Sequence, residues 1–270
     1  MTENYVMPKV ITTNIDKGGT GKSTTTYNNA KYTSGVLKKK TLLIDGDRSK
    51  NMSFSFPDLG DSTIADIFVG REVEIYEVGE NLDFIQGSQH LSDDELNLKA
   101  KQNNCMILFM WFIKNRELLS RYDYIFIDTH NDMSLVTANF IAVSDVVIGV
   151  CDPSTNSFLA WLKLKDWIKQ LKREVVDPIT GESYITAEPY LIANKIFPKT
   201  KNSRSLLKTA KEDPRYIGMI EHRKVLEDSL LINTSIFEMY DSFTNSTKKN
   251  LQDFFDNTIK VFNNILEKTK

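Results

Sequence analysis

A glycine-rich turn separates an apolar run from a helical stretch near the start of the chain. Residues 16–24 read Asp-Lys-Gly-Gly-Thr-Gly-Lys-Ser-Thr, between the β-rich run Val10–Ile15 and the helical pattern Ser23–Leu37. Glycines let the backbone turn tightly and aim consecutive N–H groups at one point, where the helix N-terminus adds partial positive charge. The segment therefore predicts a phosphate-binding strand–loop–helix unit, which places the chain in the α/β class.

Apolar runs and helical patterns alternate along the rest of the chain. Strands are predicted at Thr41–Asp45, Leu82–Ile85, Tyr124–Ile127, Val146–Cys151, Tyr190–Ala193 and Tyr216–Ile220, and helices at Ser157–Val176 and Asn202–Glu212. This alternation predicts right-handed βαβ units in a mostly parallel, twisted sheet with helices on both faces. No repeat or long linker divides residues 1–270, so we expect a single domain, with Asp177–Pro189 as a surface excursion.

Composition narrows the functional classes. The 270 residues carry 34 Lys and Arg against 36 Asp and Glu, a formal net charge of −2, which excludes a wholly basic nucleic-acid coat protein. Two cysteines, Cys105 and Cys151, form neither a disulfide framework nor a metal-ligand spacing, so we expect a cytoplasmic protein. No apolar stretch has the length of a signal peptide at the N-terminus or of a transmembrane helix elsewhere.

The phosphate-binding segment predicts specific ligand contacts. Lys22 is expected to reach the β- and γ-phosphates of a nucleotide, and the Ser23 hydroxyl to complete the coordination of Mg²⁺. The expected nucleotide-binding residues of the loop are Gly18, Gly19, Thr20, Gly21, Lys22, Ser23 and Thr24. The usual pattern has glycine at position 16, where this chain has aspartate, and a second lysine, Lys17, precedes the paired glycines.

This variant resembles the ParA/MinD family of deviant Walker A ATPases, whose mark is Lys-Gly-Gly-x-Gly-Lys-Ser/Thr. The resemblance implies a P-loop NTPase fold and a homodimer that sandwiches two ATP molecules. It further implies that Lys22 acts within its own subunit, whereas Lys17 crosses the interface to the phosphates of the partner subunit. A second cation that arrives only when the dimer closes would let ATP hold the dimer together.

Two strands end in carboxylates that fit the same chemistry. Leu42–Asp47 resembles the family's first switch region, which implies that Asp47 orients the attacking water and that Asp45 supports the metal site. Tyr122–Thr129 resembles a Walker B strand, which implies that Asp128 holds Mg²⁺ through water. From the residues alone, Asp45 and Asp47 could instead cap the following loop.

The chain also departs from the family pattern. The usual continuation Pro-Gln-x-Asn is replaced by Arg48, Ser49, Lys50 and Asn51, of which only the last matches. Two prolines usually follow the Walker B aspartate, whereas this chain has His130 and Asn131. His130 could sense the γ-phosphate or be a loop residue without a role. These departures leave the geometry of the switch segments and the hydrolysis rate open.

The resemblance extends from about Val10 to about Ser229. Asn194 matches the position that reads the adenine base, a task for which an amide offers both a donor and an acceptor. Residues 194–224 contain nine basic residues against three acidic ones, an asymmetry typical of a phosphate-backbone footprint. The expected DNA-binding residues are Lys199, Lys201, Arg204, Lys208, Lys211, Arg215, Arg223 and Lys224.

The resemblance to partition proteins of this family implies a function. We expect an ATP-dependent DNA-segregation ATPase whose dimer binds double-stranded DNA without sequence preference, and a centromere-binding ParB-like partner that stimulates slow hydrolysis. Only nine residues precede Val10, so an N-terminal helix-turn-helix is not expected. The protein would associate with the nucleoid when ATP is bound. A solvated helix face is the alternative interpretation of the basic residues.

Two other functions remain open. MinD relatives bind membranes through a terminal amphipathic helix, and an apolar stripe runs through residues 245–268. The polar face of that stripe mixes lysines with Asp253, Asp256 and Glu267, which is a poor membrane face, so we expect it to pack on the sheet. A metabolic enzyme of the same nucleotide-binding superfamily is the second alternative, although no small-substrate pocket is evident from the sequence.

Overall fold

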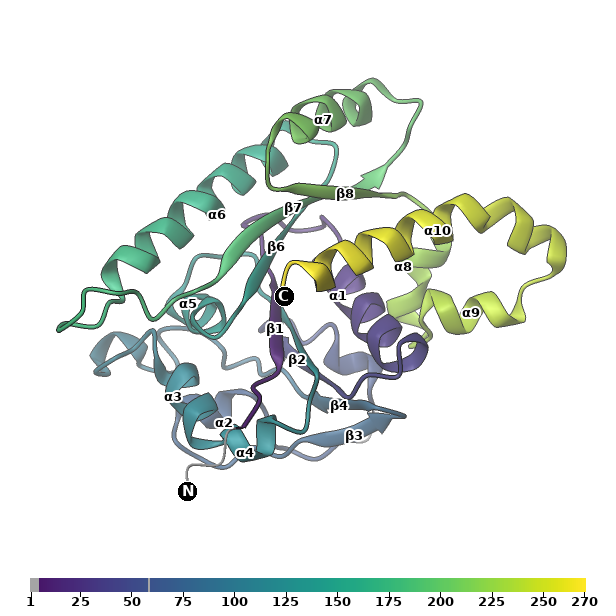
Figure 1. Cartoon of the computed structure of the whole chain (residues 1–270). Helices are drawn as coiled ribbons and strands as arrows, with labels where there is room; N and C mark the ends of the chain where they lie inside the picture. Colours follow the sequence, from purple (N-terminus) through teal and green to yellow (C-terminus); the bar gives the residue numbers. More distant parts are fainter. Residues whose placement is uncertain (1–4, 58) are drawn as a thin grey trace.

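A computed structural model describes residues 5–57 and 59–270; residues 1–4, part of the short segment before Val10, lie outside the description. An eight-stranded sheet forms the centre, with strand order β3-β4-β2-β5-β1-β6-β7-β8 (Figure 1). The strands are β1 (Lys9–Thr13), β2 (Thr41–Gly46), β3 (Tyr76–Gly79), β4 (Leu82–Ile85), β5 (Tyr124–Thr129), β6 (Val146–Cys151), β7 (Glu188–Ile196) and β8 (Tyr216–Glu221). All neighbouring strands are parallel except β3 and β4, which confirms the mostly parallel sheet expected from the sequence.

Helices connect the strands. They are α1 (Lys22–Lys31), α2 (Ala65–Phe68), α3 (Ile107–Lys114), α4 (Arg116–Leu119), α5 (Leu135–Ala142), α6 (Thr155–Glu174), α7 (Lys201–Glu212), α8 (Lys224–Leu231), α9 (Ile236–Ser242) and α10 (Asn245–Glu267). Five of them begin at a Ser or Thr whose side chain accepts a hydrogen bond from the first helical turn. These N-cap residues are Ser134, Ser154, Thr200, Ser235 and Thr244.

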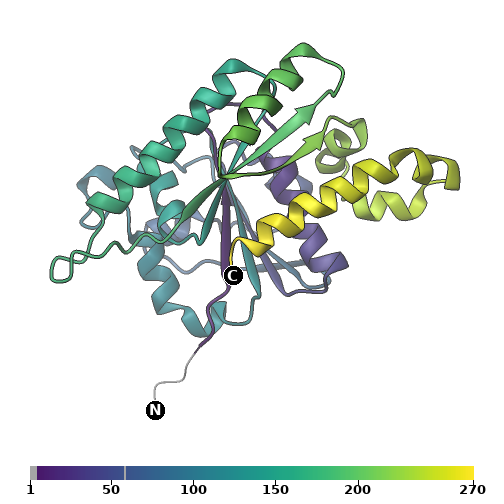
Figure 2. The same cartoon turned by 45° about the horizontal axis from the view of Figure 1, so that its top comes forward.

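Alternating side chains of the strands enter different hydrophobic clusters. Ile11 and Leu43 pack with α1, α8, α9 and α10, whereas Val10 and Leu42 pack with α2 to α5. At the other end of the sheet, Val147 belongs to a third cluster with α6 and α7. Figure 2 shows the yellow α10 and the purple α1 on one side of the sheet and the teal α6 on the other. Because both faces are covered, the inner strands β2 and β6 are buried at every position rather than at alternate ones.

The sequence prediction and the structure differ at three places. The helix predicted to run to Leu37 is α-helical only to Lys31 and continues as a π-helix over Tyr32–Val36. The excursion predicted to end at Pro189 is shorter, because β7 already begins at Glu188 and pairs with β6 there. The short, half-buried β3 has no long apolar run and is not indicated by the sequence pattern.

The terminal helix packs on the sheet, as expected. Helix α10 buries Phe254, Phe262 and Ile265 in the same cluster as Ile192 of β7 and Ile217 of β8. Its Asn257 and Asn264 side chains also donate to the carbonyl groups of Met219 and Ile217 in β8. Within the described ranges, no helix combines the length and the apolar character that a membrane span requires.

The topology determines where the functional groups meet. The chain leaves β1 toward β2 on one side, whereas β6 pairs with β1 on the other side, so the direction of strand order changes at β1. Open parallel sheets bind ligands at such a point, beyond the carboxyl ends of the strands. The loop directly after β1 is the glycine-rich segment 16–24.

Close packing between β6 and α6 makes the backbone at Gly149 sensitive to substitution. A methyl group there would lie 2.5 Å from Cε3 of the fully buried Trp161, so Gly149→Ala should lower the free energy of unfolding by about 1–3 kcal/mol. Gly35→Ala is the matched control, because its added methyl group meets nothing within 4 Å. Urea unfolding monitored by tryptophan fluorescence measures both. Equal midpoints for the two variants would contradict this packing.

Candidate nucleotide-binding site

A pocket of about 670 Å³ opens at the carboxyl ends of the parallel strands. The phosphate-binding loop forms its floor through Gly18, Gly21 and Lys22, and the segments after β2, β7 and β8 form its walls. Its volume lies within the range of pockets that bind small molecules and cofactors. Of the predicted nucleotide-binding residues, Gly18, Gly19, Gly21, Lys22, Ser23, Thr24 and Asn194 line it, and Thr20 is buried directly beneath.

Two glycines give the loop its shape. Gly19 and Gly21 have φ angles of +76° and +94°, in the left-handed region that side-chain-bearing residues avoid. A Cβ at Gly21 would also collide with the amide of Asn194, whose Nδ2 donates to the Thr20 carbonyl over 2.8 Å. The loop is therefore fastened to the end of β7 and enters α1 in a fixed orientation.

The two lysines of the loop occupy different environments. Lys22 is 7% exposed, and burial lowers the pKa of its ammonium group. The negative charges of Asp128 and Asp47 act in the other direction and raise this pKa. Lys17 lies nearer the surface, and its Nζ forms a 2.7 Å ion pair with Asp152 after β6. Asp152 also accepts a hydrogen bond from the Ser154 hydroxyl, which fixes the carboxylate. Because of this ion pair, Lys17 does not line the nucleotide pocket of its own subunit.

Asp45 is fully buried and serves the loop after β2. Its Oδ1 accepts from the Asp47 N–H over 3.1 Å, and its Oδ2 accepts from both the N–H and the hydroxyl of Ser53, over 2.9 and 2.6 Å. Burial still raises the pKa of Asp45 to about 6. The loop-capping interpretation therefore describes Asp45 well, and its contribution to a metal site stays a prediction.

Asp47 lines the pocket next to the phosphate-binding loop. Its Oδ1 accepts a 2.8 Å hydrogen bond from the Ser49 N–H and lies 2.7 Å from Nδ1 of His130. Burial opposes ionisation of this carboxyl group, but these two hydrogen bonds outweigh it and hold the pKa of Asp47 below its ordinary value. Asp47 is therefore a carboxylate at neutral pH.

Asp128 ends β5 opposite Asp45 of β2. It is 1% exposed, and within the described residues neither of its oxygens accepts a hydrogen bond of ordinary geometry. Burial and the negative charge of Asp45 raise the pKa of Asp128 to about 8, against the opposing influence of the nearby Ser23 hydroxyl. A buried carboxylate without partners is costly, and a hydrated cation next to it would compensate both its charge and its unused acceptors. The site therefore fits Mg²⁺, with Asp128 behind Ser23.

Asn194 has one amide atom in use and one free. Its Nδ2 contacts Thr20, whereas its Oδ1 is buried and has no hydrogen-bond donor in the described part of the chain. An exocyclic amino group of a base is a donor of the kind this oxygen lacks. The predicted role of Asn194 in adenine recognition thus depends on its Oδ1 as an acceptor, because its Nδ2 is already bound to Thr20.

The predicted DNA-binding residues separate into two groups. Lys201, Arg204, Lys208 and Lys211 share one exposed face of α7, opposite the buried Leu206 and Ala210. Within the described residues, none of these four forms an ion pair with an acidic side chain. The remaining members are the exposed Lys199, Arg223 and Lys224, and Arg215.

Arg215 is less available for a ligand than the α7 residues. Its guanidinium forms a 2.7 Å ion pair with Glu188 and lies over the ring of Tyr190. Arg223 is paired in the same way with Glu221, over 2.8 Å. The exposed α7 face, which we call the basic stripe (Lys201, Arg204, Lys208 and Lys211), has no acidic partner in the described residues, although the Arg204 guanidinium donates to the Lys199 carbonyl over 2.8 Å.

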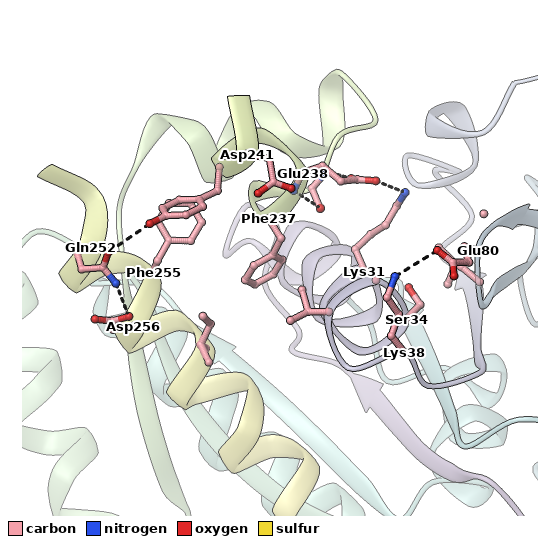
Figure 3. Close-up of a pocket in the computed structure, with 17 residues that line it drawn as sticks. Lys31, Ser34, Lys38, Glu80, Phe237, Glu238, Asp241, Gln252, Phe255 and Asp256 are labelled. Atoms are coloured by element: carbon pink, nitrogen blue, oxygen red, sulfur yellow. Dashed lines mark hydrogen bonds and ion pairs between the residues drawn. The ribbon is translucent and has the colours of Figure 1, made fainter. Parts of the chain in front are cut away.

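A second pocket, of about 530 Å³, lies at the other end of α1 (Figure 3). The ion pairs Lys31–Glu238 and Lys38–Glu80 flank it, and Phe237 and Phe255 line its apolar part. The whole length of α1, about 15 Å for ten residues, separates it from Lys22. It therefore cannot share the chemistry of the phosphate-binding loop.

Three residues of the site are not identified by the sequence analysis. Asp152 pairs with Lys17, Ser53 holds Asp45, and the buried Asn14 donates to Thr129 Oγ1 and to the His130 carbonyl. Each lies in a loop or at a strand end that no motif marks. Their position just beyond the carboxyl end of a strand is the signal that would have singled out Asn14 and Asp152.

Comparison with known proteins finds a matching family model and several relatives. A protein-family model described as an AAA domain matches residues 8–180. An uncharacterised protein of Methanocaldococcus jannaschii is 27% identical over 178 residues, which are 63% of this chain and 68% of that protein. Alignments with other curated relatives span 62% and 56% of their length, so the chain spans less than two thirds of those proteins.

Solved structures share the fold over nearly the whole chain. A protein of Borrelia burgdorferi B31 described as a plasmid partition protein, with AMPPNP bound, superposes with a TM-score of 0.74 at 23% identity, covering 97% of this chain and 99% of that one. Apo McdA from Cyanothece superposes with a TM-score of 0.78 at 18% identity, with the same coverage.

The uncompensated burial of Asp128 predicts a pH-dependent stability. Its carboxyl group ionises near pH 4 in the unfolded chain but only near pH 8 in the folded one, so ionisation favours unfolding as the pH rises between these values. Asp128→Asn removes this penalty, and its stability relative to wild type should increase from pH 5 to pH 8 by up to about 1.4 kcal/mol per pH unit. Urea unfolding without Mg²⁺ or nucleotide measures it.

The control for this prediction is the exposed Asp253→Asn, which should match the wild type at every pH. If Asp128→Asn also matched the wild type, Asp128 would have a compensating partner in the ligand-free protein.

Proposed function

Because this chain belongs to the ParA/MinD family of deviant Walker A ATPases, we propose that it is an ATP-dependent partition ATPase. In this proposal two subunits close around two ATP molecules with Mg²⁺, and the dimer binds double-stranded DNA without sequence preference. Hydrolysis, slow in the free dimer and stimulated by a centromere-binding ParB-like partner, separates the subunits and releases the DNA. The cycle takes place in the cytoplasm, on the nucleoid while ATP is bound.

The contrast between Lys17 and Lys22 is the observation that carries this proposal. Lys22 is buried within the pocket, and the nearby negative charges of Asp47 and Asp128 favour its charged form. A lysine that binds phosphates in its own subunit needs such a position. Lys17 lies outside that pocket, paired with Asp152. A cation that is held at the surface and does not reach its own ligand is suited to reach the ligand of a second subunit.

The residues of the pocket support ATP hydrolysis. Mg²⁺, when bound, supplies positive charge that neutralises the phosphates. Ser23 and Asp128 would hold it, with Asp45 in support, while Lys22 would bind the phosphates and Asp47 would orient the water; of these residues Lys22, Ser23 and Asp47 line the pocket. Phosphoryl transfer asks the protein mainly for positioning and charge neutralisation, and these groups provide both.

The basic stripe supports DNA binding. Its four cations project from one helix face without acidic partners in the described residues, so their charges can replace counterions on a phosphate backbone. Dimerisation would present two stripes on one particle, which raises affinity for a long duplex far above that of one subunit. DNA binding would therefore depend on ATP-driven dimerisation.

Substitution of the two lysines separates their roles. Lys22→Ala should weaken binding of ATP by about 100-fold or more, because a buried charge-assisted contact to phosphate is lost. Lys17→Ala should bind ATP nearly as tightly as wild type but fail to dimerise. Titration with a fluorescent ATP analogue and sedimentation velocity with ATP measure the two effects. An ATP dimer of normal stability in Lys17→Ala would disprove the trans role of this lysine.

Charge reversal on α7 tests the DNA proposal. The affinity of wild type for random-sequence duplex DNA should require ATP and fall steeply between about 50 and about 200 mM salt. Lys201→Glu with Lys208→Glu should reduce that affinity and lower the salt slope by about one unit per lost contact, without affecting ATP binding. The matched control, Lys249→Glu with Lys260→Glu on α10, makes the same change in net charge. Equal loss in both pairs would show that net charge, not the stripe, governs binding.

A further inference from the structure

His130 joins the two loops that carry the carboxylates of the site. It comes directly after β5, and its Nδ1 lies 2.7 Å from Oδ1 of Asp47, which comes directly after β2. Both side chains are largely buried, at 19% and 10% exposure, so water competes little for the contact. The residue to which the sequence alone assigns no definite role thus contacts the group expected to orient the attacking water.

The backbone of His130 is fixed from a third strand. Asn14, fully buried just beyond β1, donates through Nδ2 to the His130 carbonyl over 3.2 Å and to Thr129 Oγ1 over 2.7 Å. The Thr129 hydroxyl in turn donates to the Thr13 carbonyl over 2.9 Å. These bonds tie the start of the His130 loop to the strand that leads into the phosphate-binding loop. The imidazole is therefore presented to Asp47 from an anchored position.

The hydrogen bonds on Asp47 distinguish its two oxygens. Oδ1 accepts from the Ser49 N–H and from His130, whereas Oδ2 accepts neither of these bonds. Rotation of the carboxylate about its terminal bond would break both, because the two donors approach the same oxygen from different loops. The Ser49 hydroxyl also stabilises the ionised carboxylate, and Oδ2 is the oxygen that the Ser49 N–H and His130 do not occupy, with a direction that these two donors determine.

We propose that His130 is a positioning residue for hydrolysis: by donating its Nδ1–H to Oδ1 of Asp47, it holds Oδ2 toward the attacking water. The inference rests on the proposed ATPase function and assigns one further residue to it. Both the Nδ1–H tautomer and the imidazolium ion donate from this nitrogen, so the role does not depend on the charge of the ring. His130 acts through Asp47 and touches neither the nucleotide nor the water.

The position of the donor atom allows a sharp test. The Nδ2 of an asparagine stands the same number of bonds from the backbone as Nδ1 of histidine, whereas the Nε2 of a glutamine stands one bond further. His130→Ala should lower the rate of a single turnover of ATP roughly tenfold, which is the scale for loss of one orienting contact. His130→Asn should recover most of that rate, and His130→Gln should not. Dissociation constants for ATP should stay within about twofold of wild type in all three.

A double-mutant cycle shows whether the effect passes through Asp47. In an Asp47→Ala background, adding His130→Ala should change the residual rate by less than about twofold, because the group that His130 orients is gone. His90→Asn, at an exposed histidine that does not line the pocket, is the matched control and should hydrolyse ATP like wild type. Thermal unfolding of each variant with bound ATP reports separately on folding.

The outcomes distinguish this inference from the proposed function. If wild type hydrolyses ATP and Asp47→Ala does not, a normal rate in His130→Ala overturns the role of His130 alone. Equal losses in the Asn and Gln variants, or additive losses with Asp47→Ala, overturn it as well, since they indicate a merely structural or an independent effect. If wild type hydrolyses no ATP, with or without DNA, both the proposed function and this inference fail.

Discussion

The meeting of three parallel strand ends at one edge of the sheet governs the rest of this structure. Strands β1, β2 and β5 are neighbours in register, so Thr13, Asp45 and Asp128 lie side by side. The loops after these strands, which are the phosphate-binding loop, the Asp47 loop and the His130 loop, must then share one small volume. The charges of Lys22, Asp47 and Asp128 are brought together by backbone pairing, and the hydrogen bonds of Asn14 and Ser53 only refine their positions.

That arrangement is not at its most stable without a ligand. Asp128 has two buried oxygens without donors within the described residues, Asn194 has one, and Lys22 is a buried cation beside them. Such groups lower the stability of the fold but are available to a metal ion, a base and phosphates. By contrast, both oxygens of Asp45 accept hydrogen bonds from groups of the protein itself, namely Asp47 and Ser53. Between the paired carboxylates Asp45 and Asp128, only Asp128 therefore has oxygens that a ligand could satisfy.

Much of this could be predicted from the sequence, and the remainder has physical reasons. The strands Leu82–Ile85 and Val146–Cys151 are apolar runs bounded by polar residues, and their predicted limits match the structure. The lining residues of the phosphate-binding loop are predictable from a local motif whose glycines take the left-handed conformation. The contacts Lys17–Asp152 and Asp47–His130 join residues 135 and 83 positions apart, and no periodicity in the sequence encodes them. Strand β3 escapes prediction because a short edge strand needs little apolar sequence.

The strand order also constrains how the molecule is made. Strand β1 lies in the interior of the sheet and pairs only with β5 and β6, so Lys9 finds its partner at Tyr124 and Ile11 finds one at Val146. During synthesis the phosphate-binding loop leaves the ribosome before either neighbour of its strand, because β5 begins only at Tyr124 and β6 only at Val146. Pairings so distant in sequence form slowly, since a long loop must close first. The nascent β1 thus emerges as a strand without a sheet, and its unpaired edges stay exposed until β5 and β6 follow.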